Sequence, residues 1–108
     1  MWNETDLDQV RHHLDRAVAE GMVFADPNDL HVGRDALEAN VRRFRTERPR
    51  LGFRVSSGVD LHHDRCRYEW QLVLRHRVLM TGLDVASFDR NGLIERVDGF
   101  FGPLPSSS

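Results

Sequence analysis

The chain has 108 residues, of which 40% are hydrophobic and 30% charged, and a formal net charge of −2. This length predicts one compact domain over residues 1–105, and the three closing serines after two prolines predict a disordered tail at 106–108. The small net charge gives no electrostatic case for nucleic acid or membrane as a partner, and no apolar run approaches the roughly 20 residues of a spanning helix. The single cysteine, Cys66, excludes an internal disulfide framework, and residues 1–20 lack the apolar core of a secretory signal, so we expect a cytoplasmic protein.

The first half of the chain predicts two amphipathic helices separated by two short strands. Apolar residues recur at helical spacing over 7–20, after polar residues that can cap a helix, and Gly21 is expected to end this helix. Two short apolar runs follow at 22–25 and 30–33, separated by the turn sequence Asp-Pro-Asn-Asp. A second amphipathic helix is predicted over 34–47.

After residue 50 the hydrophobic pattern changes from helical spacing to alternation. This alternation predicts strands over 53–61, 66–74 and 78–88, and a last strand after Asn91-Gly92. Asn-Gly supplies the two positive-φ residues of a type I′ hairpin turn, which makes it the strongest local signal in the sequence. Helices that precede a run of antiparallel strands predict an α+β fold, with the helices packed on one face of a curved sheet.

Five segments of the chain resemble one known family in their order and spacing. They read V-F-A-D-P-N at 23–28, G-R-D-A-L at 33–37, Y-E-W at 68–70, T-G-L-D-V at 81–85 and N-G-L-I-E-R-V-D-G-F-F-G-P at 91–103. Together they resemble the SnoaL-like, polyketide cyclase-like branch of the nuclear transport factor 2-like superfamily. The resemblance implies a cone-shaped barrel, in which a strongly curved, mostly antiparallel sheet carries two or more helices on its concave face and encloses an apolar pocket. It also implies a homodimer through the outer surface of the sheet, but little about the reaction, because the same cone serves many enzymes and binding modules.

The chain departs from the family pattern in two places. Relatives usually carry a helix ahead of a segment like Trp-Asn-Glu-Thr-Asp, with which this sequence begins, so the resemblance implies a pocket that lacks part of its cover. Epoxide hydrolases of this superfamily resemble one another in an Arg-x-Asp on the penultimate strand and an Asp on the last strand. Asp84 matches the first Asp, but Gly82 and Gly99 stand in place of the other two residues. Epoxide hydrolysis of that type is therefore disfavoured.

Asp84 is the residue best suited to acid–base chemistry, because it is the only charged residue between Val78 and Phe88. On a pocket-facing strand, an apolar surround would raise the pKa of its carboxyl group toward the value that proton abstraction beside a carbonyl requires. The alternative is a structural carboxylate, bonded to backbone or to a helix residue such as Asn40. Asp26 is a weaker catalytic candidate, because Asp-Pro-Asn-Asp also forms an ordinary turn.

Aromatic and apolar side chains are candidates for contacts with a ligand, although core packing is the competing role for each of them. The candidate ligand-binding residues are Phe24, Asn40, Phe44, Phe53, Tyr68, Trp70, Met80 and Phe101. We expect a protein that binds an apolar or carbonyl-bearing small molecule, with cofactor-free isomerase or cyclase chemistry at Asp84. The alternative is a non-catalytic ligand-binding or dimerisation module, and the sequence leaves open whether the chain is an enzyme.

Other clusters in the sequence predict no further site. The six histidines form no ligand pattern with cysteines or carboxylates, so no metal is expected. Arginines gather over 42–54, but without the aromatic platforms or docking motif that nucleic-acid binding uses. The expected partners are therefore a small apolar ligand and a second copy of the chain.

Overall fold

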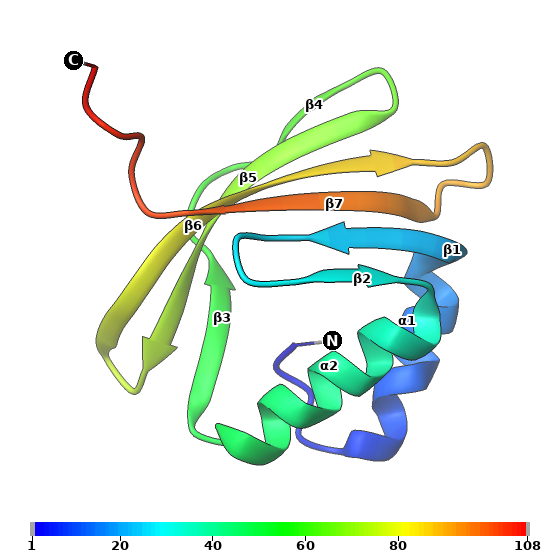
Figure 1. The fold of residues 1–108 in the computed structure, drawn as a ribbon, viewed down its shortest axis with the longest axis horizontal. Coiled ribbons are helices and arrows are strands. Elements are labelled where there is room, and N and C mark those ends of the chain that lie inside the picture. Colours follow the sequence, from blue (N-terminus) through cyan, green and yellow to red (C-terminus); the bar gives the residue numbers. More distant parts are fainter. Residues whose placement is uncertain (1, 108) are drawn as a thin grey trace.

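A computed structural model describes residues 2–107, which form an α+β fold (Figure 1). Within these residues, neither helix has the length and apolar character needed to cross a membrane. In the predicted tail, residues 106–107 have no regular secondary structure, and Ser108 lies outside the described residues. After a 3₁₀ turn at Leu7–Gln9, the elements are α1 (Val10–Ala17), β1 (Val18–Ala25), β2 (Leu30–Val32), α2 (Arg34–Glu47), β3 (Leu51–Val55), β4 (Asp60–His62), β5 (Arg65–Leu74), β6 (Arg77–Phe88) and β7 (Ile94–Phe101).

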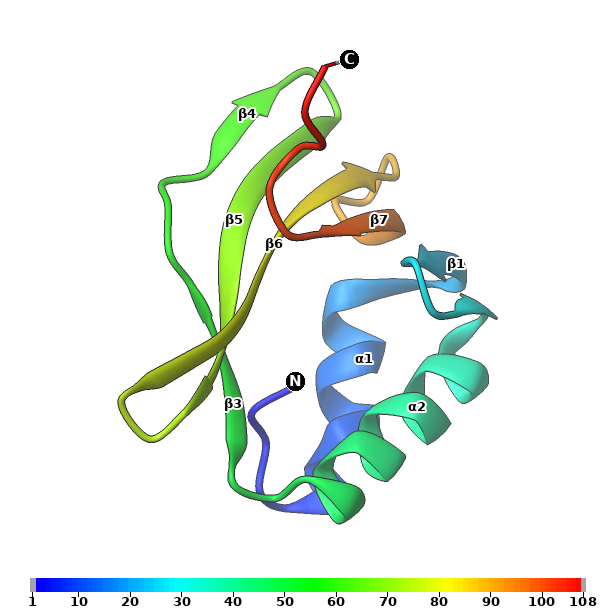
Figure 2. The same ribbon diagram turned by 60° about the vertical axis from the view of Figure 1, so that its left-hand side comes forward.

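The strands form one curved sheet in the order β2-β1-β7-β6-β5-β3, with β4 paired to β5. Among the described residues, the neighbouring strands are antiparallel except β1 and β7, which run parallel. Figure 2 shows the sheet bending around α1 and α2, which lie on its concave side. The predicted fold class is thus confirmed, and the cone is an open one, because no pairing joins the edge strands β2 and β3 within residues 2–107.

The hydrophobic core lies where the two helices meet the first strand. Both helices contribute through the apolar stripe that the sequence pattern predicts. Within this core, Val18, Met22 and Leu37 also line a cavity on the concave side of the sheet, so the core forms part of the cavity wall. The fully buried side chains are Val10, Leu14, Val18, Met22, Leu37 and Val41.

The first helix is shorter than predicted, and Gly21 lies inside β1 rather than at a helix end. Val18, the first residue after the helix, pairs with Ile94 in the parallel β1–β7 ladder. Its carbonyl oxygen accepts hydrogen bonds from Arg34, at 3.1 Å from Nε and 2.7 Å from Nη2. Pairing with a distant strand therefore overrides a helical periodicity that continues locally through residue 20.

The strand predicted over 53–61 is interrupted between β3 and β4. The Ser57 hydroxyl accepts the backbone N–H of Glu69 at 2.8 Å and donates to the carbonyl oxygen of Gly58, also at 2.8 Å. A side chain thus takes the place of a backbone partner in the ladder, which is a known way for serine to end regular structure. The prediction of one continuous strand here is wrong.

The β6–β7 hairpin is confirmed, but its predicted type I′ turn is wrong. Of Asn91 and Gly92, only Gly92 has a positive φ, at 79°. The N–H of Gly92 donates to the Asp89 carbonyl oxygen at 3.0 Å, and the Asp89 carboxylate accepts the N–H groups of Asn91 and Leu93, each at 2.9 Å. Asp89 therefore organises a longer loop in which a glycine closes a turn, a common alternative to the two-residue connection.

Candidate functional site

A cavity of about 520 Å³ lies between the concave face of the sheet and helix α2. Its walls include both candidate carboxylates, Asp26 and Asp84. The structure therefore brings all the candidate site residues to one place, while their roles in binding and catalysis stay predictions. The candidate ligand-binding residues that line the cavity are Phe24, Asn40, Phe44, Phe53, Tyr68, Trp70, Met80 and Phe101.

The aromatic side chains of the cavity pack on one another as a continuous wall. The ring of Phe53 lies 5.2 Å from the ring of Phe44 and 5.6 Å from that of Trp70, measured between centroids. Trp70 in turn lies 5.9 Å from Phe101, with the two rings nearly perpendicular. These separations are typical of attractive aromatic pairs, so the wall offers a fixed apolar surface to a flat ligand.

Asp84 is held by two hydrogen-bond donors from the neighbouring strand β5. The Tyr68 hydroxyl donates to Oδ2 of Asp84 at 3.1 Å, and Nε1 of Trp70 donates to Oδ1 at 2.9 Å. Tyr68 is the cross-strand partner of Asp84, so their side chains share the inward face of the sheet. These partners are not predicted from the sequence, where the family pattern points instead to positions 82 and 99. Alternation groups Tyr68 with Trp70 on one face of β5, but only the pairing register brings that face to Asp84.

Gly82 makes room for the Trp70 indole beside Asp84. A Cβ atom at position 82 would lie 2.1 Å from Cζ2 of Trp70, a distance that real Cβ contacts do not reach. The indole thus occupies the space over the strand where the epoxide hydrolase pattern carries an arginine. Trp70 Nε1 then supplies a donor to Asp84 from the next strand.

Asp26 and Asn40 have local partners of their own. The Asp26 carboxylate accepts the N–H groups of Asn28 and Asp29, each at 2.9 Å, which confirms the turn interpretation of Asp-Pro-Asn-Asp. Oδ1 of Asn40 accepts a hydrogen bond from Arg43 at 3.0 Å, so this amide reaches a residue of its own helix. The suggested partnership between Asn40 and the cavity carboxylate is therefore wrong.

Solved structures with the same architecture identify the fold of this chain. No protein-family model and no curated protein matches the chain. A proposed isomerase of the SnoaL-like family from Agrobacterium tumefaciens superposes with a TM-score of 0.89 and 29% identity, over 94% of this chain and 88% of that one. The chain has the SnoaL-like fold.

More distant solved structures share the SnoaL-like fold with this chain. A SnoaL-like protein of unknown function from Burkholderia thailandensis has a TM-score of 0.73 and 17% identity, over 94% of this chain and 86% of that one. A proposed SnoaL-like polyketide cyclase from Jannaschia has a TM-score of 0.69 and 13% identity, over 88% of this chain and 78% of that one. At such identities the likeness shows the fold alone, so the chemistry of this SnoaL-like chain has to be argued from its own residues.

Burial determines the acid–base character of the SnoaL-like cavity. Burial raises the pKa of the Asp84 carboxyl group above its ordinary value; the hydrogen bonds from Trp70 and Tyr68 lower it, and the nearby charge of Asp26 raises it. Burial also raises the pKa of the Tyr68 hydroxyl, with the Asp84 charge adding to the effect. Tyr68 therefore stays protonated near neutral pH and acts as a donor.

Replacing Tyr68 should change the pKa of Asp84 in a direction that the hydrogen bond fixes. In Tyr68→Phe we expect the pKa of Asp84 to rise further, because a donor that favours the charged carboxylate is lost. We also expect a loss of about 1 kcal/mol in the free energy of unfolding at neutral pH, shrinking at acidic pH where Asp84 is protonated. Carboxyl chemical shifts followed by NMR over a pH titration, with denaturation at both pH values, would check this; an unchanged or lowered pKa would contradict it.

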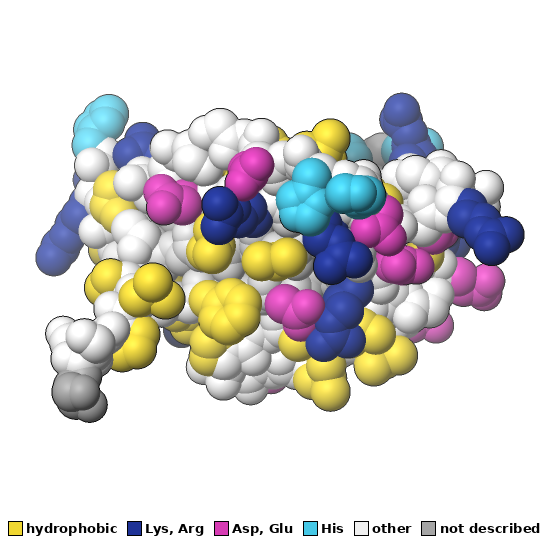
Figure 3. Space-filling view, turned by 90° about the horizontal axis from the view of Figure 1, so that it is seen from above, with side chains coloured by type: hydrophobic (Ala, Val, Ile, Leu, Met, Phe, Trp, Pro, Cys, Tyr) yellow, Lys and Arg dark blue, Asp and Glu magenta, His cyan; other side chains and the backbone are white. Residues whose placement is uncertain are grey.

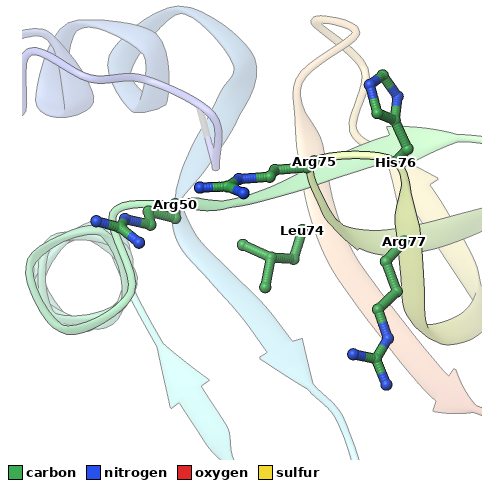
Figure 4. Close-up of a pocket in the computed structure, with 5 residues that line it drawn as sticks. All are labelled: Arg50, Leu74, Arg75, His76 and Arg77. Atoms are coloured by element: carbon green, nitrogen blue, oxygen red, sulfur yellow. The ribbon is translucent and has the colours of Figure 1, made fainter.

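A second hollow lies on the surface at the β5–β6 hairpin and is drawn in Figure 4. It is lined by Leu74 with Arg50, Arg75, His76 and Arg77, and none of these is a candidate site residue. It lies open to solvent, and none of the described residues that line it is a carboxylate that could act as Asp84 does in the cavity. Within residues 2–107, no group of three or more histidine, cysteine or acidic side chains is placed to hold a metal ion.

Proposed function

We propose that this SnoaL-like chain binds a small apolar or carbonyl-bearing molecule in its cavity and uses Asp84 for cofactor-free proton transfer, as an isomerase or cyclase does. The observation that carries the proposal is a carboxylate of raised pKa on the wall of an aromatic-lined cavity. The cavity volume of about 520 Å³ lies within the roughly 300–1,000 Å³ of small-molecule sites. The proposed isomerase from Agrobacterium tumefaciens, at 29% identity, supports the same reaction class.

Asp84 is suited to remove a proton from a carbon beside a carbonyl group. Tyr68 and Trp70 each bond one carboxylate oxygen, and each oxygen has two lone pairs, so a lone pair on each is left for the substrate. The C–H bond breaks, its proton moves to the carboxylate, and the electron pair passes into the carbonyl to give an enolate. Where a C=C bond is conjugated with this enolate, the protonated Asp84 returns the proton to the far carbon of the conjugated system while the double bond shifts and the carbonyl re-forms. This completes an isomerisation with no oxidant or reductant.

Proton exchange on a model ketone tests this chemistry directly. With β-tetralone in heavy water, we expect the protein to accelerate deuterium incorporation beside the carbonyl, measured by mass spectrometry. Native mass spectrometry of the purified protein should also reveal a bound small molecule. Failure of exchange on every carbonyl compound tried, with no bound or added ligand detected, would contradict the proposal.

The competing function is a binding module without catalysis, and one observation favours it. Both oxygens of Asp84 already accept hydrogen bonds from β5, an arrangement that also suits a carboxylate that only orients a ligand or stabilises the wall. Binding of β-naphthol, a planar mimic of the tetralone enolate, without any exchange of β-tetralone would support the module. Exchange that depends on Asp84 would support the enzyme.

A homodimer through the outer face of the sheet is part of the same proposal. Phe100 lies between Gly99 and Phe101, which line the cavity, so alternation directs it to the opposite face, where it is 58% exposed. Figure 3 shows one face of the molecule, on which hydrophobic side chains lie exposed between charges of both signs.

We expect light scattering to give twice the chain mass of 12.5 kDa, and Phe100→Glu to lower the measured mass to the single-chain value. A single-chain mass of the unmodified protein at micromolar concentration would contradict the dimer.

A further inference from the structure

The segment 2–6 passes between the edge strand β3 and the helices (Figure 2). Trp2 is half-buried and lines the cavity. Its indole lies 5.8 Å from each of three rings, those of Phe24, Phe44 and Phe53. Because these rings belong to β1, α2 and β3, Trp2 bridges the helix layer and the edge of the sheet.

Asn3 ties this segment to the free edge of β3. Its Nδ2 donates to the carbonyl oxygen of Phe53 at 2.6 Å, and its Oδ1 accepts the N–H of Phe53 at 2.7 Å. The side-chain amide thus pairs with the edge strand as the backbone of a further strand would. Asn3 is exposed, so water can take the place of both hydrogen bonds.

The other end of the segment is anchored to the first helix. Oε1 of Glu4 lies 2.9 Å from Nε2 of His13, and the Asp6 carboxylate accepts the N–H of Asp8 at 3.0 Å as an N-cap. The segment is therefore anchored where it joins the 3₁₀ turn, and where it meets the sheet it is held by the two hydrogen bonds of Asn3 and by the packing of Trp2 against Phe53. We refer to residues 2–6 as the strap.

We propose that Trp2 is a movable wall of the cavity and that Asn3 is the positioning residue that latches it, so that a ligand enters and leaves when the strap 2–6 opens. The inference rests on the proposed function in that the cavity must hold a small molecule. Asn3 does not itself line the cavity. Loosening the latch should therefore change the rates of binding and release, and leave the contacts of the bound ligand unchanged.

Binding kinetics of β-naphthol, followed by stopped-flow fluorescence, test the strap. In Asn3→Ala we expect the association and dissociation rate constants each to rise about tenfold with Kd unchanged, because two exposed hydrogen bonds no longer hold the closed form. The matched control is Asn91→Ala, an exposed asparagine on the β6–β7 loop, which should change neither rate. Trp2→Ala should weaken binding, because it removes a wall contact.

Hydrogen exchange of the Phe53 amide, measured by NMR on the ligand-free protein, gives a second readout. Asn3→Ala should accelerate this exchange about tenfold, because Asn3 supplies the acceptor for that N–H. Unchanged binding rates in a folded Asn3→Ala protein would overturn the strap and leave the proposed binding function standing. If β-naphthol does not bind at all, the proposed binding function fails for this ligand class, and the Phe53 exchange decides the latch: equal exchange overturns it, and faster exchange supports it.

Discussion

Asp84→Asn should lower the exchange of β-tetralone at least a hundredfold while the fold and β-naphthol binding persist. General-base groups contribute about 10²–10⁴ in rate, and an amide cannot accept the proton. The amide oxygen can still accept the hydrogen bond from Trp70 Nε1, and the amide nitrogen can donate to the Tyr68 hydroxyl, so the wall keeps its shape. The variant thus removes the proton acceptor while it keeps the hydrogen bonds that position 84 makes in the cavity wall.

The same variant should also change how stability depends on pH. Because burial raises the pKa of Asp84 above its ordinary 3.8, the folded protein holds this proton more tightly than the unfolded chain does. Its contribution to stability is therefore present below pH 3.8 and is lost as the pH rises through the folded pKa. We expect Asp84→Asn to lack this loss and to be no less stable than the unmodified protein at neutral pH, measured by urea denaturation over a pH series.

Asp26→Asn is the matched control for the Asp84 variant. Asparagine can accept the same backbone N–H groups, so the turn should persist. The loss of the Asp26 charge should lower the pKa of Asp84 and change the exchange rate far less than loss of Asp84 itself. Full exchange activity in Asp84→Asn would end the proposal that Asp84 is the base.

Gly82→Ala should destabilise the fold by about 3 kcal/mol, near the upper end of the usual cost of overpacking. The added Cβ would lie 2.1 Å from Cζ2 of Trp70 and 2.6 Å from the backbone carbonyl oxygen of Phe100. The indole can turn away, but the carbonyl belongs to the paired strand β7 and cannot yield without distorting the ladder. A displaced Trp70 would also lose its hydrogen bond to Asp84, so we expect lower exchange activity in the same variant.

Gly21→Ala provides the comparison for this effect. Gly21 is also a strand glycine, but apart from its chain neighbours no heavy atom of residues 2–107 lies within 4 Å of the position its Cβ would take. Its replacement should change the free energy of unfolding by less than about 0.5 kcal/mol. Denaturation curves of the two variants would be compared directly, and similar stabilities would show that Gly82 does not provide the space for Trp70.

Helices and strands whose bounds depend on the local hydrophobic pattern could be predicted from the sequence. The helix 34–47 has the predicted bounds, and the strands 65–74 and 77–88 agree to within one residue, because their periodicities are long and uninterrupted. The end of the first helix could not be predicted, since Val18 joins the sheet through a partner far along the chain. The break after β3 likewise depends on a hydrogen bond between Ser57 and a residue of another strand.

The candidate site likewise combines features that the pattern within one strand predicts with contacts between residues far apart in the chain, which it does not. Alternation groups Tyr68 with Trp70 on one face of β5 and Asp84 with Met80 on one face of β6, but it does not show which faces line the cavity. The hydrogen bonds to Asp84 depend on register across the hairpin, which includes an irregularity between Leu72 and Val73 that alternation alone does not reveal. The bonds of Asn3 join residues 50 positions apart, a contact that no spacing rule could supply.

The chain has two tryptophans, and both lie on the cavity wall, so the protein carries its own optical probes of that space. Trp70 stands on the fixed sheet, with its ring nitrogen bonded to Asp84, whereas Trp2 stands on the segment held by Asn3. Emission from single-tryptophan variants would therefore report the carboxylate surroundings through one indole and solvent access through the other. Collisional quenching by acrylamide could follow both in unlabelled protein.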